Sequence, residues 1–475
     1  MGFLRIIAVI LLGVVLVAYA GLKYSVVGQR MLPTGAGITA KQLCSLVFVA
    51  EIEEARAKAM YLDPLLEQFP IPVNVETDYS EGSVTANVPG FVRQKAQHRA
   101  GYGCTLVHDP KAGLQSAPGA KPLSPEMPLD VVHRDAVFDS NKLEAALDEA
   151  FAQSPTRSLP RNTLVVAVLH DGKLVAERYA DGITPTTRLP GWSMTKSVTA
   201  TIAGILVQQG RLDVSRAGAL KEWRGTGAPQ EDITVDHLLR MTSGLLMTER
   251  NNGRDPNSQM LFIEPDGAHY SATRELHQPV GSYYEYMSGS TVLAMRALQE
   301  AIGGDLATAL AFIQENLFAP LGMTHAVMEP DQSGTFIGSS FMLASARDWA
   351  RFGQLYIDGG RAGGAQIIPG NWIDYVTTHT EQSGANGYGA SFWIITDAQR
   401  EKDETLAALP EDTFSARGFQ GQYTHIIPSE GLVVVRLGAT NDYWIDDPEL
   451  LPLQVIQAMR AEPQTDGESS ADSQD

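Results

Sequence analysis

The chain has 475 residues, of which 44% are hydrophobic, 8% aromatic and 19% charged. This apolar fraction excludes a disordered protein, and the length allows one large domain with a smaller companion. With 36 Lys and Arg against 55 Asp and Glu, the formal charge is −19, which argues against nucleic acid as a partner, because phosphate backbones attract basic surfaces. Two cysteines in the whole chain exclude a cysteine-rich metal or iron–sulfur site.

An uncharged apolar run opens the chain. It extends over residues 6–22, after Arg5 and before Lys23, and its length is close to the lower limit for a helix that spans a bilayer. Ala18-Tyr19-Ala20 also resembles the small-residue site at which a secretory signal is cleaved. A signal peptide and an uncleaved membrane anchor are therefore both open for residues 1–30. Either one predicts export, to the periplasm or another compartment outside the cytoplasm.

Export changes the interpretation of the two cysteines. In an oxidising compartment Cys44 and Cys104 are expected to form a disulfide. Closing a loop of about 60 residues would stabilise the fold by about 4 kcal/mol in the chain-entropy model. The alternative is two unrelated buried thiols. Both cysteines lie in residues 31–130, which are interpreted as an N-terminal segment of mixed structure that ends in a Gly- and Pro-rich linker at residues 113–128.

Regular elements begin after residue 130. A helix is predicted to begin at a capping box formed by Asn141 and Glu144. Two strands are predicted over residues 163–170 and 173–179, and the Asp-Gly pair between them is a strong hairpin signal. Residues 193–208 form a helix that is apolar on nearly every side, so we expect it to be buried.

The rest of the domain is helical until the chain returns to strands. Amphipathic helices are predicted near residues 236–242, 290–302, 307–318 and 345–356. Strands are predicted near residues 390–396, 423–427 and 432–437. Strands at both ends of a domain, with helices between them, indicate a sheet whose first and last strands come together next to an all-helical region.

Ser193 and Lys196 form the sharpest chemical motif. Leu-Pro-Gly-Trp breaks the structure before Ser193, and Lys196 follows one helical turn later, so both side chains project from one face. A serine hydroxyl becomes a nucleophile when a base takes its proton, and a lysine with a depressed pKa can be that base. The helix N-terminus also offers N–H groups to developing negative charge. The alternative is a serine cap followed by a lysine that reaches out to water.

Ser193-Met194-Thr195-Lys196 and the residues after it resemble the serine β-lactamase and penicillin-binding-protein superfamily. The most similar branch contains class C β-lactamases, esterases and 6-aminohexanoate-dimer hydrolases. The second signature of this family, Tyr-x-Asn or Tyr-x-Ser, corresponds to Tyr286 and Ser288. Further similar stretches are residues 233–245 and 317–323, and the resemblance covers about residues 135–460.

A phenol at position 286 could relay a proton, protonate the leaving group or position the base. Ser288 could bind the lysine or the substrate. Taken alone, an aromatic loop of this kind is more often packing, and Tyr283 and Tyr284 are the neighbours that could be mistaken for the functional phenol. The resemblance favours Tyr286.

The third signature departs from the family pattern. β-Lactamases carry Lys-Thr-Gly on the strand that lines the active site, whereas this chain has Ala416-Arg417-Gly418 in the best alignment. The resemblance then implies an oxyanion hole made by the backbone N–H groups of Ser193 and Phe419, with Arg417 and Gly418 in contact with the substrate. A surface position is the alternative for Arg417. A shift to Gly421 and Gln422 is the alternative. Because the first lysine is missing, we do not expect efficient β-lactam turnover.

The sequence therefore predicts a serine hydrolase with no cofactor and no metal, acting on a small-molecule ester or amide through an acyl-enzyme. The fold is expected to be α/β, an antiparallel sheet flanked by helices with an all-helical subdomain, over residues 131–461. A disordered acidic tail is expected at residues 462–475. The alternative function is a catalytically silent, membrane-tethered binding or sensing protein on the same fold.

Overall fold

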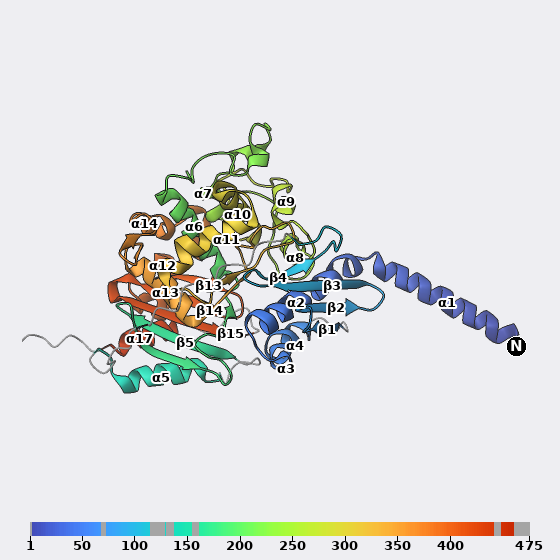
Figure 1. Ribbon diagram of the computed structural model, residues 1–475, viewed down its shortest axis with the longest axis horizontal. Helices are drawn as coiled ribbons and strands as arrows, with labels where there is room; N and C mark the ends of the chain where they lie inside the picture. The colour runs from blue at the N-terminus through green and yellow to red at the C-terminus, as the bar shows by residue number, and fades with distance from the viewer. Residues whose placement is uncertain are drawn as a thin grey trace, which may run out of the picture.

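The chain forms a long N-terminal helix, a small N-terminal layer and a large domain built around a sheet (Figure 1). The structure is a computed structural model, and it describes residues 2–67, 73–114, 129, 137–153, 161–440 and 448–459. Most of the predicted linker and the whole of the predicted acidic tail lie outside these residues.

A six-stranded antiparallel sheet forms the centre of the large domain. Its strand order is β12-β13-β14-β15-β5-β6. The bounds are β5 Thr163–His170, β6 Lys173–Tyr179, β12 Trp393–Ile394, β13 Phe414–Gly418, β14 Gln422–Ile427 and β15 Leu432–Gly438. Pairing of β5 with β15 confirms that the first and last long strands come together, and Asp171-Gly172 joins β5 to β6 as predicted.

Helices cover both faces of this sheet, which is why β5 and β15 are apolar at nearly every position. Val166 and Val168 of β5 pack on one side with α5 (Ser140–Phe151) and α17 (Leu450–Gln457). Residues 165, 167 and 169 point to the other side, into the main core. Strand side chains alternate between faces, so both faces of the sheet are buried. On that second face lie α6 (Met194–Gln208) and α13 (Ala346–Ile357).

The helical region lies between β6 and β12 in the sequence. Its helices are α7 Val235–Leu239, α8 Pro256–Phe262, α9 Gly267–Ala272, α10 Ser288–Ile302, α11 Leu306–Ile313, α12 Ala319–Leu321 and α14 Trp372–Thr377. A small sheet, β7 (Leu189–Pro190), β9 (Met342–Ala344) and β8 (Val327–Met328), connects this region to the segment before Ser193. The architecture is therefore the predicted α/β fold with an all-helical region.

Local boundaries differ from the sequence predictions at several places. The predicted capping box at Asn141 is wrong: Asp139 caps α5, and its carboxylate accepts from the N–H groups of Asn141 and Lys142. Asp is as good an N-cap as Asn, so the helix begins two residues earlier than predicted. The strand predicted over residues 390–396 is only two residues long, and the helix at 307–318 continues past Ile313 as a π-helical turn, Gln314–Phe318.

The N-terminal segment is a compact layer of its own. Its four strands form an antiparallel sheet in the order β1-β2-β3-β4, with bounds Asn74–Asp78, Ser83–Val88, Val92–Arg99 and Gly103–Val107. Helix α2 (Leu32–Cys44) packs on β2 and β3. A disulfide joins Cys44 to Cys104, at the end of α2 and in β4. The disulfide thus links helix α2 to the four-stranded sheet.

Helix α1 (Gly2–Lys23) extends away from the rest of the molecule (Figure 1). Its stretch Arg5–Lys23 is long and apolar enough to cross a membrane and has no buried residues in the protein. Near the end of α1, the Tyr19 hydroxyl donates to the carbonyl oxygen of Gly90, and the Tyr19 ring packs on Phe91 at 5.3 Å. The turn between β2 and β3 therefore contacts α1.

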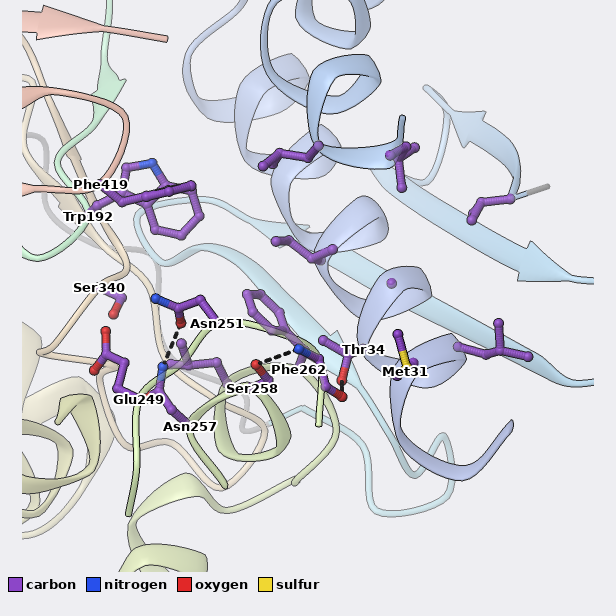
Figure 2. Close-up of a pocket in the computed structure, with 18 of the residues that line it drawn as sticks. Met31, Thr34, Trp192, Glu249, Asn251, Asn257, Ser258, Phe262, Ser340 and Phe419 are labelled. Carbon is purple, nitrogen blue, oxygen red and sulfur yellow. Dashed lines mark hydrogen bonds between the residues drawn. The ribbon is translucent and has the colours of Figure 1, made fainter. Parts of the chain in front are cut away.

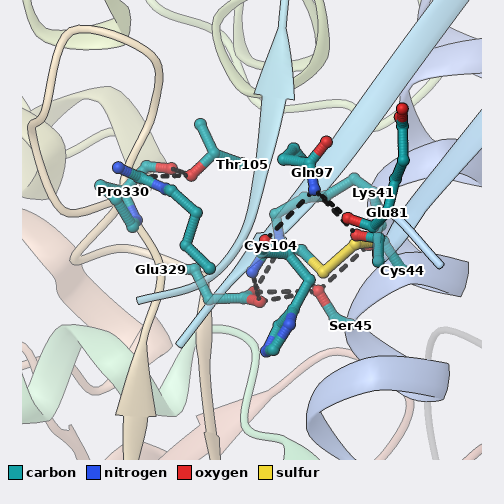
Figure 3. The surroundings of a disulfide bond; sticks show 12 residues. Lys41, Cys44, Ser45, Glu81, Gln97, Cys104, Thr105, Glu329 and Pro330 are labelled. Atoms are coloured by element: carbon teal, nitrogen blue, oxygen red, sulfur yellow. Dashed lines mark hydrogen bonds and ion pairs between the residues drawn. A yellow bond between two sulfur atoms is a disulfide. The ribbon is translucent and has the colours of Figure 1, made fainter. Parts of the chain in front are cut away.

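A buried ion pair joins the N-terminal segment to the large domain (Figure 3). Lys41 of α2 pairs with Glu329, and both side chains are almost fully buried. The Glu329 carboxylate also accepts from the Ser45 hydroxyl at 2.9 Å and from the Cys104 N–H at 2.7 Å. Because these donors satisfy the buried carboxylate, the segment is tied to the loop between β8 and β9.

Candidate active site

Ser193 lies at the N-terminus of α6 on a sharp turn. The preceding Trp192 has a φ of 48°, in the left-handed region that non-glycine residues rarely adopt. At Gly191 a β-carbon would come within 2.4 Å of the Trp349 ring. Ser193 makes no capping hydrogen bond with its side chain, and it is partly exposed. The turn therefore presents the hydroxyl to a ligand instead of using it as a helix cap.

Lys196 lies under this serine and does not reach outward to water. Its side chain is among the largest fully buried ones, with 1% exposure. The Nζ atom donates to the Ser193 hydroxyl at 2.9 Å, to the Ser288 hydroxyl at 3.0 Å and to the Ser339 carbonyl oxygen at 3.1 Å. All three N–H bonds of an ammonium are accounted for by these acceptors.

Burial lowers the pKa of Lys196 to about 8, against the opposing effect of the Glu249 carboxylate. Desolvation disfavours the charged form of an amine, which is the reason for this direction. A lysine with this pKa is neutral in a useful fraction near pH 8. It can therefore accept the proton of a hydroxyl that already touches it.

Tyr286 completes the group around the amine. Lys196 Nζ lies 4.8 Å from the centre of the Tyr286 ring, and the phenol hydrogen-bonds with Ser193. Burial and the nearby Glu249 raise the pKa of Tyr286 well above its usual value, so the phenol stays protonated. Tyr283 is half exposed, and Tyr284 packs on Tyr388 at 5.5 Å. Of the three tyrosines in this loop, Tyr286 is the one that contacts both Ser193 and Lys196.

Glu249 is a site residue that the sequence analysis missed. Its carboxylate accepts from the N–H of Ser288 at 2.6 Å, at the start of α10, and it lines the same pocket as Ser193. Loop residues without periodicity or a motif give no sequence signal, and Glu249 is one of these. The structure thus adds an anion near the Ser193–Lys196 pair.

The end of β13 lies against the turn that carries Ser193. A β-carbon on Gly418 would come within 2.2 Å of the Gly191 carbonyl oxygen, so only glycine permits this approach. The next residue, Phe419, packs edge-on against Trp192 at 5.5 Å, and the Trp192 indole N–H donates to Gln420 at 3.0 Å. Phe419 and Ser193 line one pocket.

Arg417 points elsewhere. Its guanidinium donates to the Ser415 hydroxyl at 2.8 Å and pairs with Glu449 at 2.8 Å, and it lies over the Trp393 ring. The charge of Arg417 is therefore already compensated by an anion of the chain. Of the predicted third signature, the structure brings Gly418 and Phe419 to the serine but not the Arg417 side chain.

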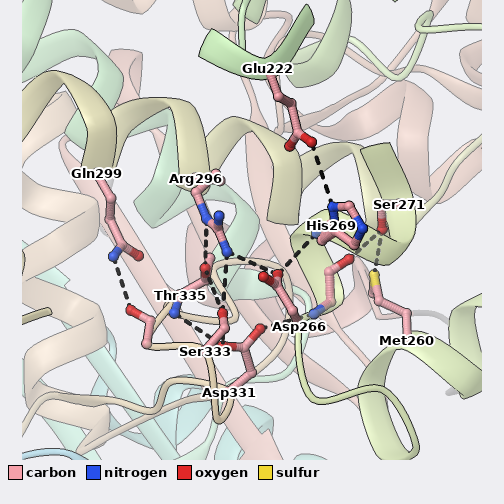
Figure 4. A network of polar contacts seen from close by, with 12 residues as sticks. Glu222, Met260, Asp266, His269, Ser271, Arg296, Gln299, Asp331, Ser333 and Thr335 are labelled. Carbon is pink, nitrogen blue, oxygen red and sulfur yellow. Dashed lines mark hydrogen bonds and ion pairs between the residues drawn. The ribbon is translucent and has the colours of Figure 1, made fainter. Parts of the chain in front are cut away.

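The loop between β8 and β9 supplies the carbonyl of Ser339 to Lys196. Glu329, at the start of this loop, anchors the loop to the N-terminal segment through the contacts described above. From the other side, Arg296 of α10 donates to Thr335 at 2.7 Å and pairs with Asp266 at 2.8 Å, and Gln299 donates to the Gly334 carbonyl at 3.1 Å (Figure 4). The third acceptor of Lys196 is thus fixed by residues far from it in the sequence.

A pocket that Ser193 lines reaches the N-terminal segment, with Trp192 and Phe419 at one end and Met31 and Thr34 at the other (Figure 2). Its volume is about 1180 Å³, open mouth included. Trp192, Phe419 and Glu249 line it together with Ser193. From the N-terminal segment it is lined by Met31, Leu32, Thr34, Gly35 and Ile38, among others. The sequence analysis assigned no role to this layer. The structure makes it a wall of the pocket.

Known proteins resemble the chain in sequence and in structure. The family model described as "Beta-lactamase" matches residues 147–454. The 6-aminohexanoate-dimer hydrolase of Paenarthrobacter ureafaciens is 23% identical over 350 residues, which are 70% of this chain and 83% of that protein.

Two solved structures illustrate the likeness of the fold. A putative 6-aminohexanoate-dimer hydrolase from Bacillus anthracis has a TM-score of 0.55 at 19% identity and covers 70% of this chain and 87% of its own. A class C β-lactamase has a TM-score of 0.52 at 14% identity, with 68% of this chain and 96% of its own covered.

Proposed function

The chain belongs to the beta-lactamase family, and from this premise we propose that it is a serine hydrolase that cleaves an ester or amide bond through an acyl-enzyme on Ser193. The observation that carries the proposal is the distance of 2.9 Å between Lys196 Nζ and the Ser193 hydroxyl, combined with a Lys196 pKa of about 8. A base of this strength in contact with an alcohol is the requirement for activating the nucleophile.

Acylation uses the neutral form of Lys196. The Ser193 oxygen attacks the carbonyl carbon while its proton moves to Lys196 Nζ. The carbonyl oxygen becomes an oxyanion, which the backbone N–H groups of Ser193 and Phe419 stabilise. The close approach of Gly418 to Gly191 supports this pairing, because it brings the residue after β13 next to the serine.

Collapse of the intermediate requires a proton for the leaving group. Tyr286 donates this proton to the departing alcohol or amine and regains one from Lys196, which carries the serine's proton. Because burial raises the pKa of Tyr286, the phenol still carries its proton when the intermediate forms. Water then attacks the acyl carbon, the acid leaves and Ser193 regains its proton.

The substrate is a small-molecule ester or linear amide, with no cofactor required. β-Lactams are expected to be poor substrates, because the cation that would meet their carboxylate is missing and Arg417 is paired with Glu449. Export through residues 1–30 is part of the proposal. The disulfide supports it, because disulfides persist in oxidising compartments.

A fluorophosphonate probe tests the nucleophile directly. The wild-type protein is expected to be labelled covalently at Ser193, and Ser193→Ala is expected to lose labelling. Lys196→Met should slow the labelling rate by at least about 100-fold, the usual contribution of a positioned base. Ser215→Ala, an exposed serine outside the site, is the matched control and should label like the wild type.

The proposal would be refuted by labelling that survives Ser193→Ala. A folded wild-type protein that neither reacts with the probe nor turns over short esters, D-amino-acid amides or linear amide oligomers would instead favour the silent binding or sensing protein.

A further inference from the structure

The pocket next to Ser193 is divided into a polar and an apolar part. Glu249, Asn251 and Ser340 lie at the same end of the pocket as the rings of Trp192 and Phe419 (Figure 2), and Ser193, which follows Trp192 in the chain, also lines the pocket. The part formed by the N-terminal segment is lined mostly by aliphatic side chains, with Thr34 as a polar exception; the aliphatic residues are Leu32, Ile38, Leu65, Leu66, Val73 and Val88. Such a division suits a ligand with a polar reacting group and a hydrocarbon chain.

The wall of the pocket also leaves free space in its aliphatic part. The aliphatic part contains Gly35, on α2, where a β-carbon would meet nothing within 4 Å. This stretch of the wall is therefore open space and not tightly packed core.

The proton donor indicates which half of a substrate enters this space. Tyr286, which we assign to the leaving group, packs against Tyr388 at 5.8 Å and Trp393 at 5.4 Å, whereas Phe419 and Trp192 line the pocket. In the proposed mechanism, the leaving group therefore departs toward Tyr286. The acyl group that stays on Ser193 would then extend into the pocket.

The aliphatic part lies close to helix α1. Met31 lines the pocket. It comes soon after Lys23, the last residue of α1, and a helical segment of this length spans on the order of 10 Å. Val88, also in the wall, is two residues from Gly90, whose carbonyl accepts from Tyr19 of α1. Tyr19, Phe91 and Lys23 gather here, and aromatic and basic residues are typical of the membrane–water interface.

We infer that the substrate is an ester with a long linear acyl chain, taken from the membrane in which α1 is anchored, and that the N-terminal segment binds this chain. This inference rests on the proposed function of Ser193. Ser193 forms an ester with the acyl group, the alcohol leaves with a proton, and water releases the fatty acid. It also favours retention of α1 over cleavage after residue 20.

A series of p-nitrophenyl esters from acetate to dodecanoate, hydrolysed by the full-length protein in detergent, tests the acyl-chain site. Burial of each methylene is worth up to about fourfold in binding, so kcat/KM for dodecanoate should exceed that for acetate by on the order of 100-fold. Gly35→Leu fills the open space and should reduce this ratio at least tenfold. Gly370→Leu, at an exposed glycine with open space around it, is the matched control and should keep the wild-type ratio.

Partition of the esters into micelles is the same for every variant, so it does not affect the comparison. Ile38→Trp narrows the same wall from a partly exposed position and serves as a second variant if Gly35→Leu does not fold. Equal kcat/KM values for acetate and dodecanoate in the wild type, or an unchanged ratio in both pocket variants, would overturn the acyl-chain site. A wild-type protein that hydrolyses none of these esters and does not react with the fluorophosphonate would overturn the proposed function itself.

The membrane route is tested in phosphatidylcholine vesicles that contain the dodecanoyl ester of 4-methylumbelliferone. The full-length protein reconstituted in the same vesicles should hydrolyse this ester at least tenfold faster than protein in separate vesicles. Equal rates in the two arrangements would overturn membrane delivery.

Discussion

Lys196 has three acceptors of two different kinds, and the difference matters for its chemistry. The Ser339 carbonyl oxygen can only accept, so it always takes an N–H bond of the amine. The two hydroxyls, of Ser193 and Ser288, can also donate. When the amine is neutral, its lone pair must therefore accept from one of these hydroxyls. The Ser339 carbonyl thus orients the lone pair toward the serines.

The pKa of Lys196 predicts the pH dependence of acylation. Because burial lowers this pKa to about 8 and the reactive form is the neutral one, kcat/KM should rise about tenfold per pH unit below pH 8 and level off above it. The check is a pH–rate profile with an uncharged short ester, whose own protonation does not change. A profile that falls as pH rises from 6 to 8 would contradict the assignment of Lys196 as base.

The variant Glu249→Gln tests the direction in which Glu249 shifts the pKa of Lys196. The carboxylate opposes the effect of burial on the Lys196 pKa, so its neutralisation should lower this pKa further and move the rising limb to lower pH. Glutamine can still accept from the Ser288 N–H, so the position of the loop is preserved. A limb that moves to higher pH would mean that Glu249 acts on another group.

At the scale of elements, the site depends on two segments whose backbones are in close contact. The end of β13 runs past the turn before α6, and Gly418 allows its backbone to meet Gly191. On the other side of Gly191, the Trp349 ring of α13 leaves no room for a β-carbon. The turn carrying Ser193 is thus packed between a strand and a helix, which sets the distance to Phe419.

Gly418→Ala should misplace the proposed oxyanion hole. The added methyl group would lie 2.2 Å from the Gly191 carbonyl oxygen, so one of the two segments must move, and a misplacement of about 1 Å can cost on the order of 100-fold in rate. We expect kcat to fall by about this factor while the pH limb of Lys196 stays where it is. Gly370→Ala is the control at an open position. A variant with wild-type kcat would show that this approach does not set the site.

At the scale of the whole molecule, the N-terminal segment is a structural part of the site. Lys41 and Glu329 are buried together, and the same loop delivers the Ser339 carbonyl to Lys196. The disulfide closes the N-terminal layer around the Glu329 carboxylate, which accepts from the Cys104 N–H. A change at this junction can therefore reach the Lys196 amine through the loop between β8 and β9.

A double-mutant cycle tests this junction. Lys41→Met and Glu329→Leu should each lower the free energy of unfolding by about 3–5 kcal/mol, because each leaves a buried charge without its partner. The double variant should be less destabilised than the sum of the two, by on the order of 0.5–3 kcal/mol. The measurement is urea unfolding with the disulfide intact, alongside kcat, which should fall in both single variants. Additive losses would show that the two side chains are not coupled.

Much of this arrangement follows from the sequence alone. The Asp-Gly hairpin and the apolar helix after Ser193 are local patterns, because the periodicity of buried residues and the turn chemistry are set by neighbours in the chain. The pairing of serine and lysine on one face follows from helical spacing. Membership of the beta-lactamase family could also be recognised from Ser193 to Lys196 together with Tyr286 and Ser288.

Other features were decided by contacts between distant residues. Glu249 comes from a loop without pattern, the carbonyl of Ser339 comes from the loop held by Glu329, and Arg417 is paired with Glu449 instead of facing the pocket. The wall that the N-terminal segment forms along the pocket also depends on contacts between distant residues. Local sequence determines which way a side chain faces on its own element, but only the packed chain determines which distant surface it meets.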